Sequence, residues 1–328
     1  MNEVIFLTEA GKNIGIGHVN RCKALSDSFK NRNIQSWFFV RGEIDKDALG
    51  VGFENLEWFD EKVIYSLSEK YKNRILIIDT YLADKKILNN LAHNFKKLIF
   101  IIDSTLNYHP SGIILFPSIY ADYYVKKGKV KADKVIYGRK YLLFSNELKE
   151  EKHFEVREKV KKIIISLGGY CSSEDLHLSI NSCLNKFPSA KIFVFGKVKQ
   201  EFNNDNIYYC GIKTKKEYLD SLYDADFAIV GAGMSLNECS LIGIPAISVC
   251  VSKSQYINAK AWEEFVGVKF INLFDKPNVS YKIQEELERI ENYDFRLLMN
   301  KTFQAKIDEK GADRAIDKIL KIYDYDSE

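Results

Sequence analysis

Short runs of β-branched and aromatic residues recur along the chain at intervals of about one helix, and this alternation limits the fold more than any other feature. In the first half the runs are VIFLT (4–8), WFFV (37–40), ILIID (75–79), LIFIID (98–103) and IILF (113–116). Segments with helical spacing, such as RCKALSDSFKNR, separate them. Because the runs are apolar at nearly every position, they predict strands buried on both faces, as in a parallel sheet covered by helices.

The alternation stops between about Leu143 and Lys161, where many charges surround isolated apolar residues. A second series follows: KIIISL (162–167), KIFVFG (191–196), NIYYC (206–210), DFAIV (226–230) and PAISVC (245–250). One large sheet with a charged excursion is the alternative, but single cores rarely grow beyond about 250–300 residues. We therefore predict two Rossmann-like, doubly wound domains, over residues 1–148 and 162–328, joined by a linker at 149–161.

Composition and charge exclude several classes of function. The net charge of +3 provides no strong basic field, so nucleic acid is not expected as a partner. No apolar run approaches the roughly 20 residues needed to cross a bilayer, and the N-terminus lacks the layout of a signal peptide. These features predict a cytoplasmic protein without stable membrane insertion. The six cysteines show no CxxC spacing, which indicates reduced thiols rather than a metal site.

The stretch GIGHVNRC follows the first predicted strand and begins a helix. Gly15 and Gly17 lie where the backbone must turn tightly or approach a ligand. His18 is either a capping or loop-packing residue or a general base, because imidazole titrates near neutral pH. Arg21 is either a surface cation or a ligand for a sugar or phosphate. The third glycine of a dinucleotide fingerprint is missing, so a nicotinamide cofactor is disfavoured and no cofactor is expected.

Two further glycine loops follow strands of the second series. Gly168 and Gly169 end the KIIISL run, and the loop is either a phosphate site or a simple strand-to-helix turn. The run GAGMSLNE opens directly after DFAIV, and its Glu238 is either a ribose ligand or a capping residue. Since ligands bind at the carboxyl ends of parallel strands, we expect a cleft between two such edges. The candidate residues of the third loop region are Gly231, Gly233, Ser235, Glu238, Gln255 and Asn258.

Two sites of this kind resemble GT-B nucleotide-sugar enzymes. The run from Asp226 to Ala259 resembles the UDP-binding region of the enzymes that transfer GlcNAc onto the lipid intermediate of peptidoglycan. That resemblance implies that Glu238 binds ribose and Ser235 binds phosphate, while Gln255 and Asn258 contact the sugar. It also implies a last helix that crosses back to the first domain.

The N-terminal stretch is similar to a narrower family. NIGIGHVNRCKALS resembles the GxGHxxRCxxLA signature of the UDP-2,4-diacetamido-2,4,6-trideoxy-β-L-altropyranose hydrolases of pseudaminic acid biosynthesis and their spore-coat polysaccharide relatives. IIDTY (77–81) resembles that family's IDxY, which adds Asp79 and Tyr81 to the candidate site. The chain departs from the family at Thr8 and Glu9, where an RxD element is usual, and at GGYCSS, where the family has GGTD.

The resemblance implies an enzyme that releases UDP from a UDP-activated acetamido-deoxy sugar. His18 would activate water toward the anomeric carbon, and the glycine loops would stabilise the diphosphate that leaves. No DxD follows a predicted strand, so no metal is expected. The alternatives are a glycosyltransferase, in which His18 deprotonates an acceptor hydroxyl, and a non-catalytic sugar-nucleotide binding protein. The partners expected are a UDP-sugar and other enzymes of the same pathway.

Overall fold

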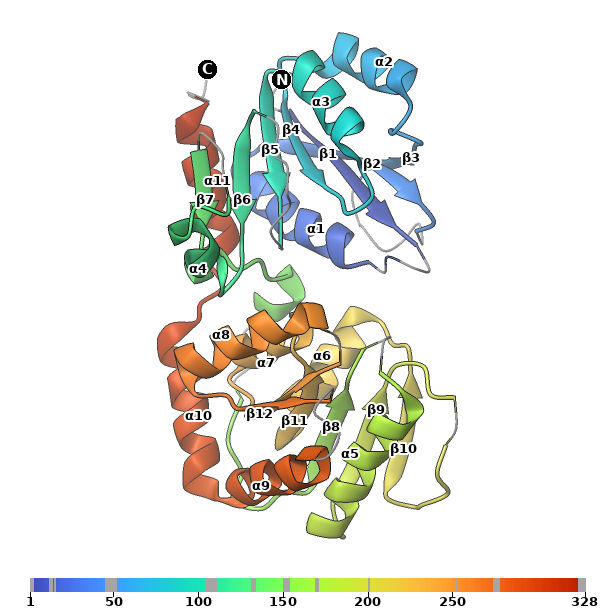
Figure 1. Cartoon of the computed structure of the whole chain (residues 1–328), viewed down its shortest axis with the longest axis vertical. Coiled ribbons are helices and arrows are strands. Elements are labelled where there is room, and N and C mark those ends of the chain that lie inside the picture. Colours follow the sequence, from blue (N-terminus) through green and yellow to red (C-terminus); the bar gives the residue numbers. More distant parts are fainter. Residues whose placement is uncertain are drawn as a thin grey trace. The chain divides into compact units, whose positions relative to one another are not determined.

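The structure is a computed structural model of the whole chain (Figure 1). It describes residues 3–11, 14, 16–44, 52–103, 111–130, 134–149, 154–168, 171–199, 201–251, 253–273 and 278–323. The chain forms two compact units. The first contains Met1–Asn146 together with Glu309–Glu328, and the second contains Glu147–Asp308.

The first unit is built on a parallel sheet of seven strands in the order β3-β2-β1-β4-β5-β6-β7. Its strands are β1 (Glu3–Ala10), β2 (Gln35–Gly42), β3 (Phe53–Asn55), β4 (Ile75–Asp79), β5 (Lys97–Ile101), β6 (Ile113–Phe116) and β7 (Lys134–Tyr137). Its α-helices are α1 (Gly17–Lys30), α2 (Glu61–Tyr71), α3 (Lys85–Asn94), α4 (Ala121–Lys126) and α11 (Gly311–Ile322). Two 3₁₀ turns, η1 (Arg139–Tyr141) and η2 (Asn146–Lys149), follow β7.

Successive side chains of β1 enter two different cores, as the period of two in a strand requires. Val4 and Phe6 pack with α1 and α11 on one face of the sheet, whereas Ile5 and Leu7 pack with α2 and α3 on the other (Figure 1). Phe6 stacks on Phe38 of β2, with ring centroids 4.5 Å apart. Burial on both faces explains why the strands read as continuous apolar runs.

Helix α11 comes from the C-terminal end of the chain but packs in the first unit. Its buried stripe of Ala312, Ala315, Ile316 and Ile319 joins the core that also contains Phe29 of α1. Polar contacts fix the same packing, because Asp313 accepts hydrogen bonds from Ser28 Oγ at 2.6 Å and from Arg32 Nη1 at 3.0 Å.

The second unit has a parallel sheet of six strands in the order β10-β9-β8-β11-β12-β13. Its strands are β8 (Lys162–Ser166), β9 (Lys191–Phe195), β10 (Ile207–Gly211), β11 (Phe227–Gly231), β12 (Ala246–Cys250) and β13 (Phe270–Asn272). Its helices are α5 (Ser173–Lys186), α6 (Lys215–Tyr223), α7 (Met234–Ile242), α8 (Tyr256–Val266), α9 (Val279–Glu291) and α10 (Tyr293–Lys306), with a 3₁₀ turn η3 (Lys253–Gln255). Helices α5 and α9 share a core with β8, and α10 packs against α7 and α8.

The prediction of two doubly wound sheets is confirmed, and the single large sheet is wrong. Each of the ten predicted strands overlaps an observed one. Strands β3, β7 and β13 were not predicted, since they are short edge strands without a long apolar run. Among the described helices, none is long and apolar enough to span a bilayer.

Candidate active site

The order of strands reverses between β1 and β4, which flank each other in the first sheet. In open parallel sheets such a switch point is where ligands bind, outside the carboxyl ends of the strands. His18 and Arg21 lie in the helix after β1, Asp79 ends β4, and Tyr81 follows it. The structure therefore brings four of the predicted residues to one switch point.

His18 is held by Asp79 in a buried pair. Its Nδ1 donates to Asp79 Oδ1 at 2.6 Å, and both residues are almost completely buried. An ionised carboxylate can only accept, so this contact requires the proton on Nδ1, and in the neutral imidazole the lone pair then lies on Nε2. Arg21 Nη2 lies 3.0 Å from the same Nδ1 and directs its hydrogen bond to Asp79 Oδ1 instead. His18 is also the second residue of α1, whose first turn contains no acidic residue and has no side-chain cap. The arrangement orients the imidazole with Nε2 able to accept a proton.

Arg21 compensates the charge of Asp79. Its Nε donates to Asp79 Oδ2 at 2.9 Å and its Nη2 to Oδ1 at 2.8 Å, which is the paired geometry that suits a carboxylate. Asp79 is only 1% exposed, and a buried carboxylate needs such a partner. The hydrogen bond from His18 therefore orients the ring rather than neutralising a lone buried charge.

Asp103 extends this network and was not selected from the sequence. It follows β5 and accepts hydrogen bonds from Arg21 Nη1 and from the hydroxyl of Tyr81. Burial opposes ionisation of Asp103, but the nearby Arg21 charge and these hydrogen bonds outweigh it and lower the pKa of the carboxyl. A signal was present, since LIFIID ends in an aspartate just as ILIID ends in Asp79.

Tyr81 lies beside the imidazole. Its ring meets the His18 ring edge-on, with centroids 4.2 Å apart and planes at 83°. Partial burial and the Asp103 carboxylate raise the pKa of its hydroxyl, so the hydroxyl remains a donor at neutral pH. About half of the side chain is exposed, which leaves ring surface for a ligand.

The second sheet has its switch point between β8 and β11. Gly168 follows β8 with φ +80° and has open space around it. Gly231 ends β11, and a Cβ there would come 3.1 Å from the Leu167 carbonyl oxygen. Gly233 precedes the first residue of α7. Small residues therefore let the two strand ends approach closely, and the backbone at Gly168 is exposed.

The start of α7 has the features of an anion site. The first amides of a helix lack intrahelical acceptors, and α7 has no side-chain cap that would use them. Ser235 is the second residue of this helix and is half-buried. Gln255 accepts the Val251 amide at 3.0 Å, and Asn258 donates to the Ala232 carbonyl at 2.8 Å. In the free protein Asn258 thus supports the glycine loop, whereas Gln255 holds the turn after β12.

Glu238 lies one turn into α7 and is paired with Lys215 of α6. Only 4% of Glu238 is exposed, and burial raises the pKa of its carboxyl despite the lysine. Lys215 was missed from the sequence because nothing in its local pattern marks it. It lies in the first turn of α6, where the helix dipole disfavours a cation, so the carboxylate is the group that favours its placement.

Glu238→Gln is expected to become more stable, relative to the wild type, as the pH rises from 4.5 to 7.5. The folded pKa lies above the ordinary value of 4.5. Glu238 therefore contributes most to the free energy of unfolding below pH 4.5, and this contribution is lost as the pH rises through the pKa of the folded state. Urea unfolding at several pH values measures the difference, and the exposed Glu264→Gln is the control. A difference that stays constant with pH would contradict the shifted pKa.

Two predicted residues, Gly15 and Gly169, lie outside the described residues, as do positions 150–153 of the predicted linker. Within the described part of the chain, no cluster of three or more His, Cys, Asp or Glu side chains is placed to hold a metal ion.

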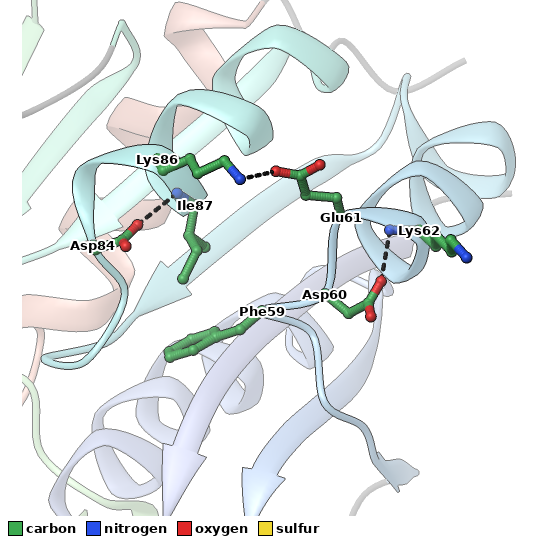
Figure 2. A pocket seen from close by; sticks show the side chains of 7 residues that line it. All are labelled: Phe59, Asp60, Glu61, Lys62, Asp84, Lys86 and Ile87. Atoms are coloured by element: carbon green, nitrogen blue, oxygen red, sulfur yellow. Dashed lines mark hydrogen bonds and ion pairs between the residues drawn. The ribbon is translucent and has the colours of Figure 1, made fainter.

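A separate cavity of about 470 Å³ opens between the first turns of α2 and α3 (Figure 2). The Lys86–Glu61 ion pair spans the two helices at 2.7 Å, and Asp60 and Asp84 accept amides of their own helices. Its polar groups are thus largely engaged with one another, and it contains none of the residues predicted from the sequence.

Comparison with known proteins identifies the type of fold. No protein-family model matches the chain, and no curated protein sequence matches it. Solved structures match along nearly the whole length. MurG of Acinetobacter baumannii is 12% identical with a TM-score of 0.62, covering 97% of this chain and 99% of that one. Anabaena HepE in complex with UDP and glucose is 13% identical with a TM-score of 0.60, covering 97% and 99%.

A putative UDP-N-acetylglucosamine 2-epimerase from Listeria monocytogenes is 8% identical with a TM-score of 0.69, covering 99% of this chain and 98% of that one. Together with the two parallel sheets, these likenesses show that the chain has a GT-B-like fold, as the sequence predicted. At such low identity they show the fold and no more.

Proposed function

We propose that this protein is a nucleotide-sugar enzyme that hydrolyses a UDP-activated acetamido-deoxy sugar. The observation that carries the proposal is the His18–Asp79 pair at the switch point of the first sheet. A histidine oriented by a buried carboxylate is a suitable general base for water. HepE in complex with UDP and glucose and the putative UDP-N-acetylglucosamine 2-epimerase, which share the fold, support a nucleotide sugar as the substrate class.

In this mechanism the second unit binds UDP and the first supplies the base. The amides at the start of α7 and of the glycine loop bind the diphosphate. The Glu238 carboxylate leaves its partner Lys215 and accepts hydrogen bonds from the ribose hydroxyls. Gln255 at the end of η3 and Asn258 in the first turn of α8 contact the sugar. Water attacks the anomeric carbon while His18 Nε2 accepts its proton. The bond from that carbon to the phosphate oxygen breaks, and UDP leaves with the electron pair.

Three further predicted residues have a part in this proposal. Asp79 fixes the tautomer of His18, and Arg21 neutralises Asp79. Tyr81 offers ring surface to the sugar. The six cysteines all lie among the described residues and form no disulfide with one another, which supports a reducing compartment such as the cytoplasm. The enzymes that make the UDP-sugar and use the free sugar would be its pathway partners, as in pseudaminic acid or spore-coat polysaccharide synthesis.

The second candidate is a glycosyltransferase, in which His18 Nε2 takes the proton of an acceptor hydroxyl. The glycotransferase of kitacinnamycin and the spinosyn rhamnosyltransferase SpnG, which share the fold, favour it. One scaffold supports both chemistries, so the fold does not choose between them.

Incubation of the purified protein with a panel of UDP-sugars, without acceptor, separates the two. Equal amounts of free sugar and UDP, formed at a catalytic rate, support hydrolysis. Turnover that begins only when a second sugar or a lipid is added would replace hydrolysis by transfer. In ¹⁸O-labelled water the label must enter the sugar, because the attack is at carbon. Label in the phosphate would refute the role given to His18.

Gly233→Ala is expected to weaken UDP binding about tenfold while uridine binding is unchanged. A Cβ at this position meets only Gln255 Nε2, at 3.8 Å, so the fold tolerates the change. The methyl group nevertheless obstructs close approach of a diphosphate to the backbone. Titration calorimetry with UDP and with uridine measures both affinities. Equal losses for the two ligands would argue against a diphosphate at this loop.

A further inference from the structure

Glu9 is a completely buried carboxylate at the carboxyl end of β1, and the proposed reaction gives it no part. Burying a charge is costly unless hydrogen bonds and an opposite charge compensate it. Such a residue at the edge of a sheet that carries a candidate active site therefore needs a physical explanation.

The contacts of Glu9 converge on one turn. Its Oε1 accepts the Thr80 hydroxyl, the Tyr81 amide at 2.8 Å and the Leu82 amide at 3.2 Å. All three donors belong to the segment that follows β4. The Thr80 hydroxyl oxygen also accepts the Leu82 and Ala83 amides, so the turn is cross-linked from within.

The other oxygen of Glu9 has no hydrogen-bond partner among the described residues. Arg41 of β2 has its Nη1 3.9 Å from this oxygen, and it also pairs with Glu57. The hydrogen-bonding capacity of Glu9 is thus directed almost entirely at the turn after β4.

That turn carries Tyr81 to the candidate base. The Tyr81 amide is fixed by Glu9, its hydroxyl donates to Asp103, and its ring lies edge-on to His18. The Tyr81 side chain is therefore held at its backbone end by one carboxylate and at its tip by another.

We propose that Glu9 is a positioning residue, which fixes the Thr80–Leu82 turn and thereby places Tyr81 against His18 and Asp103. The effect on turnover rests on the proposed function, whereas the effect on the geometry does not. A charged acceptor forms stronger hydrogen bonds than a neutral one, so loss of the charge loosens the turn without removing the side chain.

The first test uses no substrate. With its centroid 4.2 Å from that of the imidazole, the Tyr81 ring is expected to shift the NMR signals of His18 in the free protein. His18→Gln identifies those signals among the five histidines. Tyr81→Ala removes the ring and gives the unshifted reference. Glu9→Gln, which keeps the shape of the side chain, is expected to move the signals toward that reference. Glu57→Gln, the matched change on the other partner of Arg41, is expected to leave them in place. Unmoved signals in Glu9→Gln would overturn the proposal.

The second test measures turnover in a double-mutant cycle. Glu9→Gln is expected to lower kcat about 10- to 100-fold, the size of effect that a misplacement of about 1 Å produces. In the Tyr81→Ala background the same change is expected to have less than a twofold effect, because the side chain to be positioned is gone. Glu9→Asp, which keeps the charge, is expected to recover part of kcat. An equal loss in both backgrounds would assign Glu9 a purely structural role.

The two tests can be interpreted independently of each other. A wild type that turns over no UDP-sugar refutes the proposed function, and the NMR signals of His18 then decide the positioning role without it.

Discussion

His18→Ala is expected to lower kcat for UDP-sugar turnover by about 10²- to 10⁴-fold, the usual contribution of a general base. The reason is that water, or an acceptor hydroxyl, loses the group that takes its proton. Binding of UDP is expected to be unchanged, because the candidate nucleotide residues lie in the second unit. Steady-state kinetics and calorimetry with UDP measure the two effects. Turnover within threefold of the wild type would show that His18 is not the base.

Asp79→Asn tests the orientation of His18 within the same prediction. An amide can donate its N–H to Nδ1, which moves the imidazole proton to Nε2 and removes the lone pair from the reacting side. We expect a loss of kcat close to that of His18→Ala. The matched control is Asp84→Asn, since Asp84 caps α3 and asparagine caps equally well. A double variant of His18 and Asp79 is expected to be no worse than His18→Ala.

Gly311→Ala is expected to destabilise the first unit by roughly 1–3 kcal/mol, as overpacking usually does. Gly311 is the first residue of α11, and a Cβ there would lie 2.0 Å from the Leu142 carbonyl oxygen and 2.9 Å from the Leu142 nitrogen. Both are backbone atoms that cannot swing aside, so α11 must shift. Its buried stripe, including Ile316 and Ile319, would then lose packing against α1.

Thermal unfolding and hydrogen exchange measure this effect. For a unit of this size each kcal/mol corresponds to a fall in Tm of about 2–4 °C. Amides of α11 are expected to exchange faster, whereas those of α5 in the second unit keep their rates. The exposed neighbour Glu309→Ala is the control and should have little effect. Unchanged exchange in α11 would show that the helix accommodates the methyl group.

The ten strands could be predicted because a strand buried on both faces is apolar at nearly every position of its sequence. ILIID and DFAIV correspond to β4 and β11, and the polar or glycine residues that end them lie at strand ends. Switch-point geometry then made His18 and the loop at Gly231 candidate residues without any knowledge of contacts. The short edge strands β3, β7 and β13 left no comparable trace, since such segments carry few apolar residues.

The sequence by itself determined the two doubly wound sheets, the strand end at Asp79 and the helix starts after strands where His18 and Glu238 lie. Only the tertiary structure decided which of these side chains meet. In the first unit the structure places Asp103 beside Arg21 and Glu9 beside the Tyr81 amide. In the second unit it places Lys215 beside Glu238. The physical reason is that hydrophobic periodicity reports which face of an element is buried. The partner of a polar group, in contrast, depends on which strands are neighbours, and His18 and Asp79 are neighbours in space although 61 residues separate them.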